Sequence, residues 1–204
     1  MTIRTLTASL LTACCALAPL VAFSQSEPLH ITNLSPLASL RGIPAQRSVD
    51  TARGFSWAAS ATLSNHFTTD TEGEELLLLD GQTDALTLSF RYGLPQQWDV
   101  EVTVPWRNHS GGDTDNLISS WHRFFGLPDG NRDSYPTDAL HYQLSQPGHD
   151  RRLVRSASGL GDIHVAVSRP VLAIDGGQLG ISAGVKTASG QSADWLGSGA
   201  TDVY

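Results

Sequence analysis

The chain has 204 residues with 13 Lys or Arg and 20 Asp or Glu, so its formal net charge is −7. This acidic balance argues against a nucleic-acid partner. The two cysteines, Cys14 and Cys15, lie in a segment that we expect to be removed, which excludes disulfides and thiolate metal sites from the mature chain.

The first residues have the features of an export signal. One positive charge, Arg4, precedes an uncharged stretch, and Ala22-Phe23-Ser24 fits a small-x-small cleavage site. A transmembrane helix is an alternative, but the stretch is barely long enough to span a bilayer. Lipoprotein processing at Cys14 is another, and the apolar residues that continue past it argue against it. We therefore expect a signal peptide at 1–24 and a periplasmic leader at 25–52.

Five segments after the leader alternate apolar and polar side chains, and a sixth begins near Ala200. They run from Phe55 to Ser64, Leu86 to Tyr92, Trp98 to Trp106, Ile163 to Ser168 and Leu179 to Lys186. A period of two predicts antiparallel strands with two unlike faces. The pattern does not say which face meets water, because a soluble barrel or sandwich would turn the apolar face inward and a membrane barrel would turn it toward lipid.

The expected connections alternate in length. Short ones, at 93–97 and 170–177, alternate with long ones at 66–83, 108–161 and 188–199. Tight turns at one end and long loops at the other are typical of an outer-membrane barrel, whereas a soluble sandwich has no reason to sort its loops in this way.

The polar face carries scattered charges of both signs, which a water-filled interior tolerates. The lumen-lining candidates are Arg91, Asp99, Glu101, Arg107, Asp162 and Lys186. A turn between the second and third segments would place Arg91 opposite Asp99 as a cross-strand ion pair. On the apolar face, Tyr92 and Trp98 near this turn and Trp106 at the far end match two interfacial aromatic girdles.

A Gly-Asp theme recurs where the chain would return from the long loops, at 158–163, 198–203 and, more loosely, 80–85. It would place an acidic residue at the rim of the lumen, either as a ring that favours cations or as repeated turn chemistry. In the loose copy Asp84 shares the phase of Leu86, so that match requires a bulge or is accidental.

The long loop at 108–161 contains a predicted helix that Asp115 can cap and that Gly126 and Pro128 end. Its apolar residues on one face are Leu117, Ile118, Trp121, Phe124 and Phe125. This helix could enter the lumen as a plug, lie on the membrane surface or pack on the barrel rim, and we favour the rim.

No motif assigns chemistry to the chain. Asp129, Asn131 and Asp133 match three calcium-loop positions, but Ser134 replaces the required glycine, so a hydrogen-bonded turn explains them equally well. The histidines lack metal-binding spacing, and there is no GxSxG sequence. We predict no catalytic residue, no metal and no cofactor. A lipid-acting enzyme would have to use rim residues, of which His109, His122 and Ser134 are the candidates.

Five stretches resemble, in the same order, a family of predicted outer-membrane barrels known as domain of unknown function 3187. They are NLSPLASLRGIP, LLLLDGQTDALTLSFRYGLPQQWDVEVTVPW, SWHRFFGLPDGNRDSYP, SGLGDIHVAVS and LGSGATD. The resemblance implies a barrel in the outer membrane and no particular activity. Members of this family are longer, so we expect this chain to be a fragment or a truncated gene product.

The sequence thus predicts an all-β, antiparallel, up-and-down transmembrane β-barrel, of which residues 53–204 hold the N-terminal part with about six strands. We expect outer-membrane lipid as its surroundings and a passive pore for small polar solutes as its function. The alternatives are a structural or adhesive barrel whose lumen a loop closes, and a soluble periplasmic all-β binding protein. The oligomeric state and the solute stay open.

Overall fold

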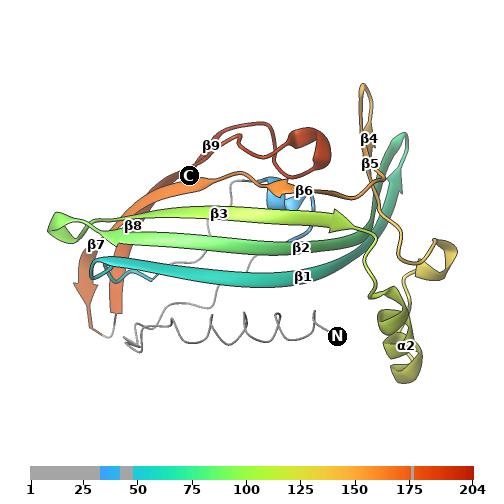
Figure 1. Cartoon of the computed structure of the whole chain (residues 1–204), viewed down its shortest axis with the longest axis horizontal. Helices are drawn as coiled ribbons and strands as arrows, with labels where there is room; N and C mark the ends of the chain where they lie inside the picture. The colour runs from blue at the N-terminus through green and yellow to red at the C-terminus, as the bar shows by residue number, and fades with distance from the viewer. Residues whose placement is uncertain (1–32, 42–47, 176) are drawn as a thin grey trace, which may run out of the picture.

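The computed structural model describes residues 33–41, 48–175 and 177–204 (Figure 1). The signal peptide expected at 1–24 lies outside these residues, as does part of the expected leader. Within the described residues, nine strands form one antiparallel sheet, accompanied by one α-helix and short 3-10 turns. No helix in this part of the chain is long and apolar enough to cross a membrane.

The predicted antiparallel β architecture is confirmed for the described part of the chain, with nine strands instead of about six, and the sheet is not closed into a barrel. The strand order is β5-β4-β2-β3-β7-β8-β9, with β1 on the other side of β2 and β6 beside β3. Closure would require the strands at the two edges to pair. Among the described residues, however, β1 pairs with β2 and β9 pairs with β8.

The first two strands, β1 (Phe55–Glu72) and β2 (Glu75–Gly93), form one long hairpin with continuous register. The loop predicted at 66–83 is therefore wrong, because both strands continue to a tight turn at Gly73, whose φ of 60° suits glycine. The alternation stops at the unbroken run of leucines from Leu76 to Leu79, so a period-two signal does not reveal this part of the strand.

The next strand, β3 (Asp99–Ser110), follows a short turn that includes η2 (Pro95–Gln97) and pairs with β2. The sheet continues through β7 (His164–Ile174) and β8 (Gly177–Lys186) to the short β9 (Asp202–Val203). β3 and β8 lie where the alternating segments predict them, whereas β7 continues to Ile174, so most of the connection predicted at 170–177 is strand.

The predicted loop at 108–161 is more structured than we expected. It contains the expected helix, α2 (Asp115–Phe125), and a turn at η3 (Arg132–Ser134). It also contains three further strands, β4 (His141–Gln146), β5 (His149–Leu153) and β6 (Ala157–Leu160). They are short and mostly polar, so they give a weak sequence signal. β4 pairs with the end of β2 nearest the Gly73 turn, and β6 pairs with β3.

The two ends of the sheet differ, although the β1–β2 connection is a tight turn and not the long loop that the alternation of connections predicts. Figure 1 shows the β2–β3 and β7–β8 turns at one end, and the tip of the β1–β2 hairpin, α2 and the β4–β5 hairpin at the other. We call these the short-turn end and the loop end.

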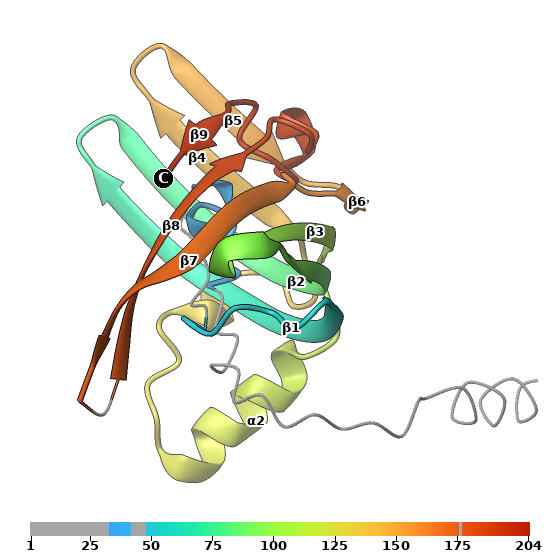
Figure 2. The same ribbon diagram turned by 90° about the vertical axis from the view of Figure 1, so that its left-hand side faces the viewer.

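The sheet curves around a concave side, seen along the strands in Figure 2, and its exposure is the reverse of that in a water-soluble sheet. Large apolar side chains cover the convex face, where Trp57 is 66% exposed and Ile181 54% exposed. The concave face buries charge, and Lys186 is 0% exposed. We call the exposed convex residues the apolar band. They include Phe55, Trp57, Leu63, Leu86, Phe90, Tyr92, Trp106, Val165, Val167, Leu179, Ile181 and Val185.

Chain segments also lie on the concave side. The turn η1 (Ala38–Leu40) and the β8–β9 loop at 187–201, which contains η4 (Ser192–Asp194), are found there. A small apolar core joins them to the sheet, with Leu37 and Leu40 packed against it. Its buried members are Leu79, Tyr142, Leu153, Ala157 and Trp195. The concave side is thus partly filled toward the loop end.

Candidate functional site

One charged group lies on the concave face near the short-turn end. Arg91 Nη2 lies 2.6 Å from Asp99 Oδ2. The register places Arg91 directly opposite Glu101, so the ion pair with Asp99 is diagonal rather than opposite as the sequence predicts. Arg91 also donates to the Asp50 carbonyl at 2.5 Å, and Ser168 Oγ donates to Asp99 Oδ1 at 2.7 Å. The guanidinium therefore links the leader to the sheet.

A second charged group lies on the concave face toward the loop end. Lys186 Nζ donates to Asp162 Oδ2 at 2.9 Å, Ser198 Oγ at 2.6 Å and the Ala200 carbonyl at 2.7 Å. Asp202 Oδ2 lies 3.3 Å from the same ammonium. Each of the three ammonium protons thus has an acceptor, as a fully buried lysine requires.

Asp162 and Arg107 hold the 187–201 loop against the concave face. The Asp162 carboxylate accepts from the backbone N–H groups of Gly190 and Ser198, each at 2.9 Å. Arg107 Nη1 donates to the Leu196 carbonyl at 2.8 Å. Only glycine fits at 197, because a Cβ there would lie 2.2 Å from Asp162 Oδ1. The loop that the sequence places outside therefore folds inward.

The six lumen-lining candidates thus fall into two groups. Arg91, Asp99 and Glu101 form one, and Arg107, Asp162 and Lys186 form the other. Two of the three copies of the Gly-Asp theme also contribute to the second group, because Asp162 and Asp202 both contact Lys186.

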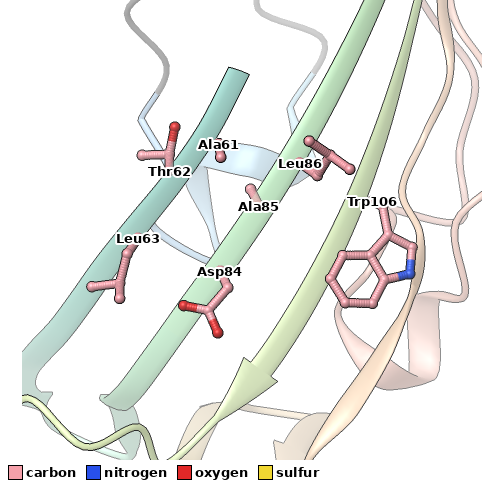
Figure 3. Close-up of a pocket in the computed structure, with 7 residues that line it drawn as sticks. All are labelled: Ala61, Thr62, Leu63, Asp84, Ala85, Leu86 and Trp106. Atoms are coloured by element: carbon pink, nitrogen blue, oxygen red, sulfur yellow. The ribbon is translucent and has the colours of Figure 1, made fainter. Parts of the chain in front are cut away.

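The third copy differs, because Asp84 lies on the convex face beside Leu86, as its phase indicates. It lines a shallow hollow, otherwise made by Ala61, Thr62, Leu63, Ala85, Leu86 and Trp106 (Figure 3). Asn108 Nδ2 donates to Asp84 at 3.2 Å, and Gln82 Nε2 donates to it at 2.9 Å. These polar groups mark the border of the apolar band toward the loop end, and we call them the polar border.

A buried network that the sequence does not indicate lies on the concave face beyond this border. Thr83 Oγ1 lies 3.1 Å from His66 Nε2, 2.9 Å from His109 Nδ1 and 3.3 Å from the Tyr142 hydroxyl. His109 Nε2 lies 3.2 Å from the Trp195 carbonyl. A carbonyl only accepts, so Nε2 carries the hydrogen and Nδ1 accepts the Thr83 proton.

Burial keeps this network neutral. It lowers the pKa of both His66 and His109 to about 4, and it raises the pKa of the Tyr142 phenol. A threonine hydroxyl that donates to a histidine resembles an activated nucleophile. Thr83, however, is only 1% exposed, so a substrate has no access to it in this conformation. The network therefore stabilises the fold at the loop end.

The rim residues that an enzyme would need are not brought together. His109 is buried on the concave side, whereas His122 lies on α2 and Ser134 follows it in the loop over the convex face. No group of three or more His, Cys, Asp or Glu side chains in the described ranges could hold a metal. The residues of the calcium-like stretch form a polar turn, in which the Asn131 N–H donates to Asp129 and Ser134 Oγ donates to Asn131.

A polar cluster on the convex side attaches α2 to the hairpin. The Asp115 carboxylate accepts from Asn65 Nδ2 at 2.9 Å, Arg132 Nη1 at 2.7 Å and the Asp138 N–H at 2.8 Å. The Arg132 guanidinium lies 5.1 Å from the centre of the Phe67 ring. The start of the helix is therefore fixed to β1.

The structure defines a mostly β protein with one antiparallel sheet, one short helix and a charged concave face. The chain belongs to the family described as a protein of unknown function, DUF3187, whose model matches residues 5–203. Searches of curated proteins and of solved structures gave no match to the chain.

Proposed function

We propose that this chain forms part of the wall of an outer-membrane β-barrel, with the apolar band against lipid and the charged face toward the interior. The reversed exposure of the sheet carries the proposal. Burying one large apolar side chain is worth roughly 1.5–3 kcal/mol, and the convex face leaves a continuous set of them uncovered. Hydrocarbon would cover the whole set, while the ion pairs remain inside.

The positions of the aromatic side chains at the limits of the apolar band support the same orientation. On β2 it runs from Tyr92 near the short turn to Leu86 beside the polar border, and on β3 it ends at Trp106. Aromatic side chains therefore stand at both limits, as in the two girdles of membrane barrels. A bilayer offers no partner to a free strand edge, so the proposal requires β1 and the last strand of the complete wall to be paired.

We further propose that the interior forms a passive pathway for small polar solutes, restricted toward the loop end. Its polar face carries the half-buried side chains of Glu101, Thr103 and Ser89, which can form hydrogen bonds with water and polar solutes. The 187–201 loop and η1 occupy the concave side toward the loop end. The proposed pathway is therefore restricted by the loop that Lys186 and Asp162 hold.

The wall and the pathway are tested separately. The wall requires the purified mature protein to need detergent or lipid, and a compact monomer dissolved in buffer alone would refute it. The pathway requires liposomes that contain the protein expressed from its complete reading frame to swell in small sugars faster than empty liposomes. Asp162→Ala, which releases the loop, should raise the swelling rate, and Asp202→Ala is the matched control.

The partial filling of the concave side favours a second candidate, a structural or binding barrel with a closed lumen. In this interpretation Trp195, which is buried within the apolar core, blocks the lumen toward the loop end. The same liposomes distinguish the two candidates. Correctly inserted protein that gives no swelling, even with Asp162→Ala, would exclude the passive pathway and leave the closed barrel.

A further inference from the structure

Helix α2 exposes the apolar stripe that should be covered in a soluble protein. Phe124 is 81% exposed, Leu117 68% and Trp121 58%. The stripe contacts itself, because the Phe125 ring lies 4.5 Å from that of Trp121 and 4.8 Å from that of Phe124, centre to centre. Among the residues of the helix, only Asp115 is buried. The apolar stripe is therefore uncovered in the described part of the chain, contrary to the favoured rim interpretation, and only the start of the helix is attached to β1.

The cluster around Asp115 fixes the level of the helix relative to the sheet. Asp115 is bonded to Asn65, which lies two residues beyond Leu63, the last residue of the apolar band on β1. At about 3.3 Å per residue, this offset is roughly 7 Å along the strand. The polar border at Asp84 and Asn108 lies in the same zone. The helix thus starts just outside the apolar band.

The direction of the helix is also informative. α2 runs across the strands rather than along them, away from the edge strand β1, and both views show it side-on (Figures 1 and 2). If the strands cross a bilayer, the axis of α2 lies near the membrane plane. At about 1.5 Å per residue, its length of about 16 Å is too short to span a membrane but suits an interfacial helix.

We propose that α2 lies in the lipid headgroup region of the membrane, with Leu117, Trp121, Phe124 and Phe125 inserted at the boundary of the acyl chains. Two observations support lipid as the occupant of the exposed stripe. The level of the helix matches the polar border, and its axis runs across the strands. The contact is mainly apolar, because the chain is acidic and α2 carries only His122 and Arg123 as basic residues.

The inference rests on the proposed membrane wall, and a depth measurement separates the two. The mature chain has no cysteine once 1–24 is removed, so single cysteines carry an environment-sensitive fluorophore to chosen positions. Phe124→Cys reports the stripe, and Asn116→Cys, which is exposed on the polar side of α2, is its matched control. Val165→Cys reports the apolar band. The proteins are inserted in phosphatidylcholine vesicles with a nitroxide quencher near the headgroup or near the chain end.

We expect the probe at 124 to shift to the blue and to be quenched several-fold more by the shallow nitroxide than the probe at 116. The probe at 165 should be quenched most by the deep nitroxide. A water-exposed probe at 124 with a deep probe at 165 would overturn the helix proposal and leave the wall standing. Water exposure of the probe at 165 would overturn the wall. A probe at 124 shielded from both nitroxides would indicate a protein partner and would also overturn the proposal.

Discussion

Asp162→Ala should release the 187–201 loop without unfolding the sheet. The substitution removes the buried carboxylate partner of the Lys186 ammonium and the acceptor of the Gly190 and Ser198 N–H groups. Removing one partner of a buried ion pair costs about 3–5 kcal/mol. The affected contacts all lie within the loop and at Lys186, so the cost falls on local opening around Gly190 and Ser198 rather than on the long β1–β2 hairpin, while Arg107 and the buried Trp195 still hold the middle of the loop. At roughly 1.4 kcal/mol per factor of ten, the opening equilibrium should rise on the order of a hundredfold or more.

Chemical labelling of a lysine can measure how often the 187–201 loop opens. Lys186 is the only lysine in the sequence, so an amine-reactive reagent has one side-chain target, and it is 0% exposed in the closed loop. Peptide mass spectrometry then gives the acylation rate of Lys186, with the N-terminal amine as an internal reference. Asp202→Ala removes a 41% exposed partner of the same lysine and should raise the rate only a few-fold. Equal rates in the wild type and Asp162→Ala, or equal rates in the two variants, would refute the reasoning.

Three further predictions concern His109, Asp80 and Val165. Because the pKa of His109 is lowered, the unfolded chain takes up a proton below pH 6.5 and the folded chain only near pH 4. Lowering the pH over that interval should therefore reduce the free energy of unfolding by roughly 3 kcal/mol. A melting temperature that does not change between these pH values would contradict this. Burial raises the pKa of Asp80 to about 6, so Asp80→Asn should stabilise the loop end by roughly 1–3 kcal/mol above pH 6 and by nothing below pH 4, as measured by urea unfolding. Val165→Arg should cost about 2–4 kcal/mol in a bilayer, whereas a melting temperature unchanged in lipid would show that this face meets water.

The sequence predicts the strands best where each residue has a distinct inside or outside neighbour. β2 and β3 are correctly placed between Leu86 and Trp106, and the apolar period and a terminal glycine are enough to place α2. The predicted cap is wrong, because the N-cap residue is Thr114, without a side-chain cap bond, and Asp115 is the first residue of the helix. A period-two pattern does not detect two kinds of strand in this protein. The outer half of the β1–β2 hairpin contains a run of leucines, and β4 and β5 are short and polar.

The candidate site likewise contains some residues that the sequence predicts and others that it does not. Arg91, Arg107 and Lys186 follow from the alternation, because their phase alone places them on the polar face. The contacts of Thr83 with His109 and Tyr142 join distant segments without any short spacing that could reveal them. The inward fold of the 187–201 loop is also hidden, because a glycine-rich segment between strands normally indicates an external loop.

The reach of the β1–β2 hairpin has a practical consequence. Beyond Leu63 the two strands continue to Glu72, roughly 30 Å at about 3.3 Å per residue, with the β4–β5 hairpin paired alongside as a brace. On a cell whose surface carried this protein, the tip at Gly73 would stand well clear of the lipid. A peptide epitope inserted into that turn should therefore be accessible to antibodies on intact cells.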